Sequence, residues 1–117
     1  MTDPCVFCAI IAGEAPITNL VAHWPNVWAI VPLNPVVDGH ILFIPTVHVE
    51  DFSTDPAVSS SVMFRAAQYA QQHGGDCNLI TSKGKEATQS VFHAHLHLVP
   101  RRAGDGLSLP WTEQVTA

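Results

Sequence analysis

The sequence predicts an α+β fold in which an antiparallel sheet of about five strands packs against one long helix. Three short β-prone runs come first, a stretch with helical periodicity follows, and two more β-prone runs come after it. Strands that are grouped on either side of a single helix indicate an antiparallel sheet rather than repeated βαβ units. A chain of 117 residues can bury its own core, so we expect one domain over 1–117.

The first three β-prone runs are rich in aliphatic and aromatic residues, and turn residues separate them. Pro25-Asn26 lies between the first and second runs, and the stretch 34–39 lies between the second and third. Short turn-rich loops join antiparallel neighbours, so these runs predict adjacent strands. The predicted strands are 19–23, 27–31 and 41–44.

The long helix is predicted from its two ends as well as from its periodicity. Asp55 is a good N-cap and Pro56 suits the first helical position. Apolar residues then recur at helical spacing until Gly74-Gly75, which supplies a stop. Strands over 77–81 and 92–99 follow, and 103–117 is expected to be an irregular tail.

Composition limits the classes of partner. Hydrophobic residues make up 47% of the chain and charged residues only 13%, so we expect part of the surface to be covered in a homodimer. The net charge of -5, with only five Lys and Arg, argues against a nucleic-acid polymer as the main ligand. No apolar run is long enough for a membrane helix, so no membrane partner is expected. Three cysteines, an odd number, suit a reducing compartment, and we expect a cytoplasmic protein.

Three histidines alternate with apolar residues in the last predicted strand. His93, His95 and His97 would share one face of that strand, at intervals of about 6.5–7 Å, while the residues between them enter the core. A polar strand face without chemistry, a metal cluster and nucleophilic catalysis all fit this spacing. The spacing alone does not rank the last two.

The segment HAHLHLVP resembles the histidine-triad motif, His-φ-His-φ-His-φ-φ, of the HIT superfamily. The resemblance extends to CVFCAII near the N-terminus, to AIVPLNPVVDGHILFIPTVH, and to Gln89-Ser90 before the triad. It implies a HIT-like fold, with a sheet that continues across a dimer. It also implies a nucleotide hydrolase or nucleotidyl transferase that forms a covalent nucleotidyl-histidine and releases a nucleoside monophosphate.

By this resemblance His95 is the nucleophile, and the backbone carbonyl of His93 orients it. His97 and the segment 89–91, which comprises Gln89, Ser90 and Val91, would hold the phosphate oxygens. Ser90 would help to protonate the leaving group, and His40 would be a fourth, supporting histidine. Imidazole suits this role because it is nucleophilic near neutral pH.

The resemblance places an apolar slot for the base at Phe7, Ile10, Ile30 and Leu33. Ordinary core packing explains each of these four equally well. The expected ligand is a purine nucleotide or its conjugate, a derivative of adenosine or guanosine monophosphate. Nucleoside phosphoramidates are the first substrate class and dinucleoside polyphosphates the second.

Three positions depart from the pattern of the family. Pro32 stands where many members have an Asp that binds the ribose, Ser82 replaces an Asn of the substrate site, and Thr88 replaces a Gly. Proline offers neither an acceptor side chain nor a backbone donor. Pro32 and Ser82 motivate an alternative function, a nucleotide- or zinc-binding module with little turnover. A hydrolase that uses the triad as metal ligands is a third possibility.

The pair Cys5 and Cys8 forms a C-x-x-C motif, which on its own is a weak indication of metal binding. Some bacterial histidine-triad proteins complete a zinc site with two histidines, which correspond here to His48 and His93. The resemblance therefore implies structural Zn²⁺ at these four residues, with no catalytic metal required. A buried thiol pair and a redox pair are the alternatives.

Overall fold

The computed structural model describes residues 5–16 and 19–111. Its elements follow the predicted order, with two additions, a short helix near the N-terminus and a 3₁₀ turn before the last strand. They are α1 (Val6–Ile11), β1 (Asn19–His23), β2 (Val27–Val31), β3 (Ile41–Pro45), α2 (Pro56–His73), β4 (Cys77–Ile80), a 3₁₀ turn η1 (Lys85–Ala87) and β5 (Leu96–Pro100).

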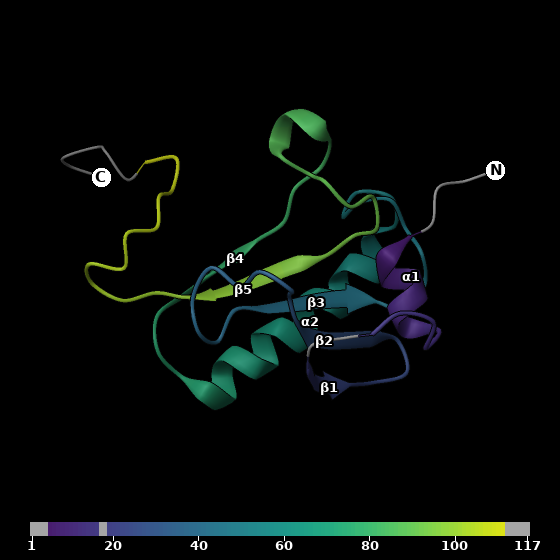
Figure 1. Ribbon diagram of the computed structural model, residues 1–117, viewed down its shortest axis with the longest axis horizontal. Helices are drawn as coiled ribbons and strands as arrows, with labels where there is room; N and C mark the ends of the chain where they lie inside the picture. Colours follow the sequence, from purple (N-terminus) through teal and green to yellow (C-terminus); the bar gives the residue numbers. More distant parts are fainter. Residues whose placement is uncertain (1–4, 17–18, 112–117) are drawn as a thin grey trace.

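The five strands form one sheet in the order β1-β2-β3-β5-β4, and every neighbouring pair is antiparallel (Figure 1). The chain leaves β3, passes through α2 to the far edge at β4, and returns through β5 to pair with β3. β5 is therefore an inner strand, with β3 on one side and β4 on the other. This position carries the last triad histidine into the middle of the sheet.

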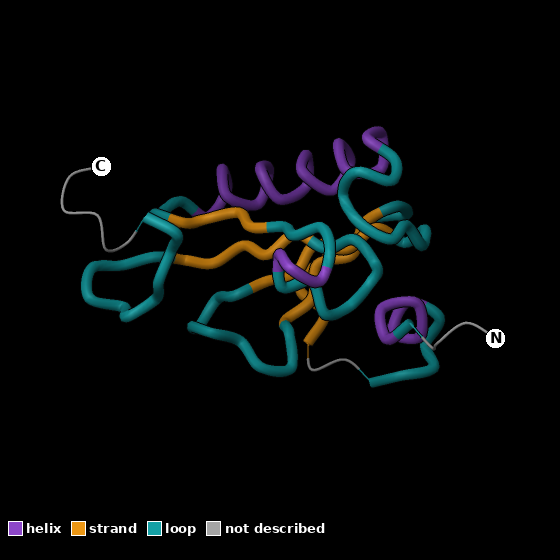
Figure 2. The backbone as a smooth tube through the Cα atoms, turned by 90° about the horizontal axis from the view of Figure 1, so that it is seen from above, coloured by secondary structure: helices purple, strands orange, loops and turns teal. Residues whose placement is uncertain are grey.

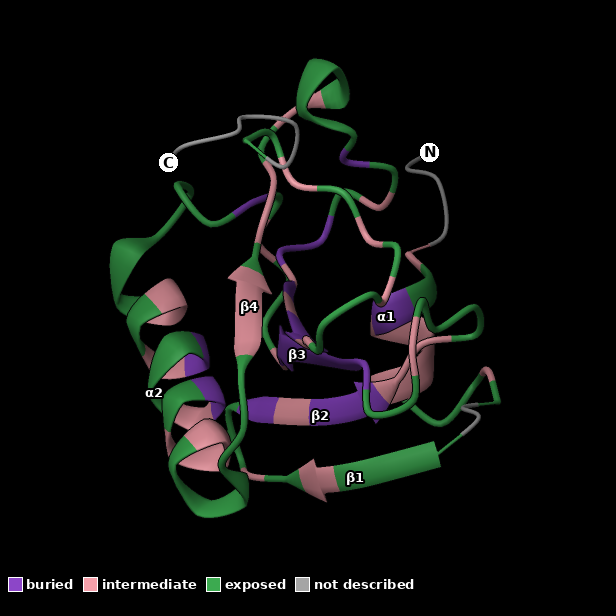
Figure 3. Cartoon of the chain, turned by 90° about the vertical axis from the view of Figure 1, so that its left-hand side faces the viewer, coloured by how far each residue is buried: buried purple, intermediate pink, exposed green. Residues whose placement is uncertain are grey.

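The two helices cover opposite faces of the sheet (Figure 2). On the α2 face, Val62 and Ala66 of the helix pack against Phe43 and Leu96 of the strands. On the other face, Phe7 of α1 packs against Ile30 and Ile44. Figure 3 shows the result, because β2 and β3 are mostly buried while β1 at the edge is largely exposed.

The helix α2 begins and ends where its predicted caps lie. The Asp55 side chain accepts a hydrogen bond from the Ala57 amide at 3.0 Å, and Pro56 is the first helical residue. Gly74 ends the helix with a φ of 65°, a left-handed value that glycine adopts at low cost. None of the helices in the described part of the chain is long and apolar enough to cross a membrane.

The prediction of a strand over 92–99 is wrong at its start, because β5 begins only at Leu96. His93 and His95 lie in an extended segment before the strand, and the backbone of this segment bonds outside the sheet. The Ala94 amide donates to the Val49 carbonyl at 2.8 Å, and the His95 carbonyl accepts from the Thr81 hydroxyl at 2.7 Å. Residues 103–111 contain no helix or strand, and the rest of the predicted tail, 112–117, lies outside the described residues.

Candidate active site

His95 lies where the triad segment enters the sheet, and its two ring nitrogens have different surroundings. Nδ1 is 2.8 Å from the backbone carbonyl oxygen of His93, so this nitrogen must carry the proton and donate it. In the neutral ring Nε2 then keeps a lone pair. The ring of Phe7 meets His95 edge-on, with centroids 5.2 Å apart. The arrangement presents Nε2 of His95 as a nucleophile.

His97 is oriented by His40, a residue on the loop before β3. The Val36 amide donates to Nδ1 of His40 at 3.1 Å, so the proton of His40 lies on Nε2. His40 Nε2 donates this proton to Nδ1 of His97 at 2.9 Å. Nδ1 of His97 is therefore an acceptor, and the ring of His97 carries its own proton on Nε2. The backbone amide of Val36 thus fixes His97 as an N–H donor.

Burial keeps these supporting rings neutral. Burial, with smaller contributions from His95 and His40, lowers the pKa of His97 from 6.5 to about 4. Burial also lowers the pKa of His40. A neutral His97 near pH 7 can donate one hydrogen bond through Nε2 without carrying a charge of its own.

A cavity of about 400 Å³ opens beside His95 and His97. Predicted site residues Ser82, Gln89 and Ser90 line it, together with Thr88. Its volume lies in the range of small-molecule sites. The structure therefore brings His95, His97 and the hydroxyl side chains of Ser82, Thr88 and Ser90 to one hollow.

Gln89 braces the loop that borders this cavity. The side chain is buried, its Oε1 accepts from the Gly84 amide at 2.8 Å, and its Nε2 donates to the carbonyls of Glu50 and Val91 at 2.8 and 3.1 Å. Both amide hydrogens are engaged within the protein. Gln89 therefore holds the loop that presents Ser90, rather than offering its own amide to a ligand.

Thr88, the residue that replaces a glycine of the family pattern, lies at the rim of the same cavity. Its φ of 71° and ψ of 21° are left-handed, and no other non-glycine residue in the described ranges has a positive φ. A β-branched residue in this region is strained. The loop keeps its left-handed turn although the glycine is missing.

The four residues predicted to form the base slot are divided between the core and the surface. Phe7 and Ile30 are buried in the core on the α1 face, and Ile10 packs at its edge with Val91. Leu33 is 77% exposed. Pro32 precedes it and is half-buried. Of the four, Phe7 has a direct contact with the triad.

Sequence reasoning missed two features that border the site. Thr81 directly follows β4, and its hydroxyl holds the His95 carbonyl. Arg101 forms a clasp with Asp105, at 2.8 Å, and with the side chain of Asn78 and the carbonyl of Leu107, at 2.8 and 2.9 Å. The clasp holds residues 107–109 as one wall of the cavity. Opposite charges at i and i+4, next to the triad, were the only sign of it in the sequence.

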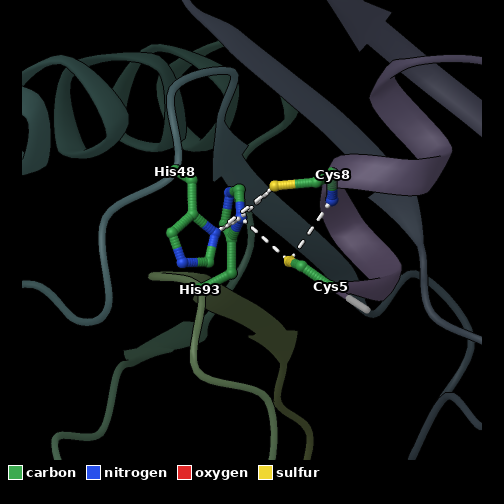
Figure 4. A group of neighbouring side chains, drawn as sticks. All are labelled: Cys5, Cys8, His48 and His93. Carbon is green, nitrogen blue, oxygen red and sulfur yellow. Dashed lines mark hydrogen bonds between the residues drawn. The ribbon is translucent and has the colours of Figure 1, made fainter. Parts of the chain in front are cut away.

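The residues Cys5, Cys8, His48 and His93 come together around the first histidine of the triad (Figure 4). Their four ligand atoms lie within 4.8 Å of one another. His93 is fully buried, and its Nε2 is 2.9 Å from the Pro45 carbonyl oxygen. Nε2 is therefore the donor, and Nδ1 turns its lone pair to the cluster. Cys5 also caps α1, because its Sγ accepts from the Cys8 amide at 3.4 Å.

The distances within the cluster fit a tetrahedral zinc ion. Bonds of about 2.05 Å to nitrogen and about 2.3 Å to sulfur give edges of about 3.3 Å for N···N and about 3.6 Å for N···S. The Nδ1 atoms of His48 and His93 are 3.1 Å apart. The three recorded N···S distances are 3.3, 3.3 and 3.6 Å. The donor set, two thiols and two imidazoles, is one that zinc prefers.

The HIT domain family model matches residues 13–104. An uncharacterised HIT-like protein of Mycobacterium tuberculosis is 38% identical, over 91% of this chain and 77% of that protein. The adenosine 5′-monophosphoramidase HNT1 of Saccharomyces cerevisiae is 31% identical, over 96% of this chain and 72% of the enzyme. The crystal structure of a zinc-bound histidine triad family protein from Mycobacterium smegmatis has a TM-score of 0.76 and 40% identity, and the match covers 90% of this chain and 80% of that one. The chain belongs to the HIT family.

Proposed function

We propose that the protein is a nucleotide hydrolase or nucleotidyl transferase that acts on the α-phosphate of nucleoside phosphoramidates or related nucleotide conjugates. The observation that carries the proposal is the state of His95, whose Nδ1 is engaged by the His93 carbonyl while the ring borders a cavity of about 400 Å³. The monophosphoramidase named above supports the choice of substrate class.

In the first step Nε2 of His95 bonds to the α-phosphorus, and the bond from phosphorus to the leaving nitrogen breaks. Nε2–H of His97 donates to a phosphoryl oxygen and stabilises the charge that develops there. Ser90, exposed on the cavity, relays a proton from water to the leaving amine. The products of this step are the free amine and a nucleotidyl-His95.

In the second step a water oxygen bonds to phosphorus, and the bond between phosphorus and Nε2 of His95 breaks. One proton of the water passes to solvent, and a nucleoside monophosphate leaves. An acceptor other than water would give nucleotidyl transfer by the same route. Each step forms one bond to phosphorus and breaks another. After the second step His95 is again the unmodified ring that entered the first step.

The base is proposed to be a purine, of an adenosine or guanosine monophosphate derivative, on the α1 side of the triad. Phe7 supports this location because its ring contacts His95, next to which the phosphate must lie. Ile10, Ile30 and Leu33 would border the base. Pro32 adds no ribose acceptor, so this proposal expects nucleotide binding to depend on base and phosphate contacts.

Structural zinc is proposed at Cys5, Cys8, His48 and His93, on the fit of the cluster distances. When bound, the metal would link the N-terminal segment to the sheet, and four protein ligands would leave it no open position for catalysis. None of the three cysteines forms a disulfide. That state supports our proposal of a cytoplasmic location.

A homodimer is also proposed, formed through α2 and the edge strand β4. Met63 and Phe64 on α2 and Ile80 at the end of β4 are 47%, 60% and 38% exposed. An unpaired strand edge beside exposed apolar side chains favours pairing with a second copy. Light scattering should report twice 12.6 kDa, and Phe64→Glu with Ile80→Arg should give the monomer mass. A monomeric wild type at micromolar concentration would refute the dimer.

Intact mass spectrometry during turnover of adenosine 5′-phosphoramidate tests the enzymatic proposal. The wild type should show a transient adenylyl adduct and release AMP. His95→Ala should lose both, with a rate at least about 10³-fold lower. His73→Gln is the control, because His73 lies on the exposed end of α2. If the wild type binds nucleotide without an adduct or product, the alternative of a binding module is favoured.

A further inference from the structure

His93 is the only described residue that both belongs to the Cys/His cluster and contacts the proposed nucleophile. Its ring contributes Nδ1 to the cluster, and its backbone carbonyl accepts the proton of His95 Nδ1 at 2.8 Å. The side chain of one residue therefore meets the metal ligands while its main chain sets the tautomer of the next histidine.

The ring of His93 and its backbone are held together by the surrounding structure, so the ring cannot move without moving the backbone. It is fully buried, and Nε2 is bound to the Pro45 carbonyl at the end of β3. The next residue, Ala94, is bound through its amide to Val49, one residue after the cluster histidine His48. The segment 93–94 is thus attached to 45–49 at two points, and a shift of the ring must shift the carbonyl that holds His95.

Without a metal, the hydrogen bonds within the cluster can be arranged in several ways. Each thiol can rotate its proton. His48 can donate through Nδ1 to the lone pair of His93, 3.1 Å away, or can accept at Nδ1 from the Cys8 thiol, 3.3 Å away. A tetrahedral ion requires all four lone pairs to point to one centre and so selects a single arrangement. Binding of the ion therefore narrows the positions available to the ring of His93.

We propose that His93 is a positioning residue through which occupation of the Cys5–Cys8–His48–His93 cluster fixes the orientation and tautomer of His95. Its effect on catalysis rests on the proposed function of His95, whereas its effect on the geometry of His95 does not. The metal then acts on the reaction without touching the substrate. The expected catalytic result is a lower kcat in the metal-free protein, with KM little changed.

The His40–His97 pair provides a reference within the same molecule. His97 is held by His40, and His40 by the Val36 amide, while the ring of His97 also meets the ring of His95 edge-on, with centroids 5.1 Å apart. His97 also lies on β5, where the sheet fixes its backbone on both sides. Because His40 has its own backbone anchor at Val36, a change that travels through His93 should alter His95 first and the His40–His97 bond much less.

The test is nitrogen-15 NMR of the histidine rings in the Zn²⁺-loaded and chelator-treated full-length protein. We expect solvent exchange of the His95 Nδ1 proton to accelerate at least about 10-fold on removal of Zn²⁺, because its hydrogen bond is held less firmly. The His40 Nε2 proton should keep its exchange rate. An unchanged His95, or an equal change at His95 and His40, would overturn the proposal.

Replacement of Zn²⁺ by Cd²⁺ serves if the metal-free protein does not fold. The larger ion lengthens the bonds to all four ligands and keeps the cluster closed, so the His95 ring resonances should shift more than those of His40. Equal shifts would contradict the coupling. A coupled His95 in a protein that releases no AMP would refute the proposed function and leave the coupling intact.

Discussion

The two outer histidines of the triad occupy equivalent places in the sequence pattern but are supported in different ways. The ring of His93 is enclosed by a cluster drawn from the N-terminal segment, the loop after β3 and the triad segment. The ring of His97 depends on one neighbour, His40, and on a single backbone amide. Equal spacing along the chain thus conceals one residue whose ring joins the Cys/His cluster and another whose ring faces the cavity.

The largest difference between the surroundings of His93 and those of His97 should appear in the free energy of unfolding when zinc is removed from the Cys/His cluster. If the cluster binds zinc only in the folded state, a free concentration 1,000 times the dissociation constant adds about 4 kcal/mol to the free energy of unfolding. A chelator, or Cys8→Ser, should remove this increment in a calorimetric scan. Cys77→Ala is the matched control, because Cys77 lies on β4 away from the cluster and its variant should still respond to chelator. Identical transitions with and without chelator would exclude a metal role.

A change at His40 should affect His97 and leave the Cys/His cluster as it is. His40→Ala removes the partner of His97 Nδ1, so the ring can turn or change tautomer and no longer presents Nε2–H reliably. We expect kcat for adenosine 5′-phosphoramidate to fall about 10–100-fold, as is typical when the partner of a functional imidazole is removed. Zinc content, measured by elemental analysis, should stay the same. A fall in zinc content would show that the two ends are not independent.

A change at Thr81 acts on His95, the middle histidine of the triad, through its backbone carbonyl. Thr81→Val keeps the shape of the side chain but leaves the His95 carbonyl without its hydroxyl partner. We expect the free energy of unfolding in urea to fall by about 1–2 kcal/mol. Thr81→Ser keeps the donor and should recover at least half of the loss. If both variants lose the same amount, packing of the Thr81 methyl group, and not the hydrogen bond, is what matters.

The smallest effect is expected at Thr88, on the loop beside the cavity. Its left-handed backbone is costly for a β-branched residue, so Thr88→Gly should raise the free energy of unfolding by about 1 kcal/mol. Thr88→Ala shortens the side chain without relieving the backbone and should gain much less. Chemical denaturation of the three proteins measures both. A gain from alanine equal to that from glycine would place the strain in the side chain instead.

Local signals were sufficient for most of the sheet and for α2. Asp55, Pro56 and Gly74 mark the ends of that helix by chemistry that each residue carries alone. The six-residue helix α1 was not predicted, because so short a helix of apolar residues forms through packing of Phe7 and capping by Cys5. The buried partners of Phe7 are Ile30, Leu42 and Ile44, which lie more than 20 positions away and so appear in no local pattern.

The predicted start of β5 was wrong for a related reason. Alternation of histidine with apolar residues shows that the backbone is extended and does not show which partner it bonds. Before Leu96 those partners are Val49 and Thr81, outside the ladders of β5. The resemblance to the family supplied the four cluster residues, whereas the roles of Thr81 and Arg101 depend on contacts with distant or irregular segments.

The clasp around Arg101 holds in place the segment that forms one wall of the cavity. Its partners, Asn78, Asp105 and the Leu107 carbonyl, anchor the C-terminal segment without using the side chains of residues 107–109. Residues 107–109 line the cavity, and the clasp itself is formed by Arg101 with Asn78, Asp105 and the Leu107 carbonyl. Substitutions there can reshape the space offered to a leaving group while the histidines stay in register. In engineering terms, the clasp makes this wall of the cavity a part that can be redesigned while Arg101 keeps the segment in place.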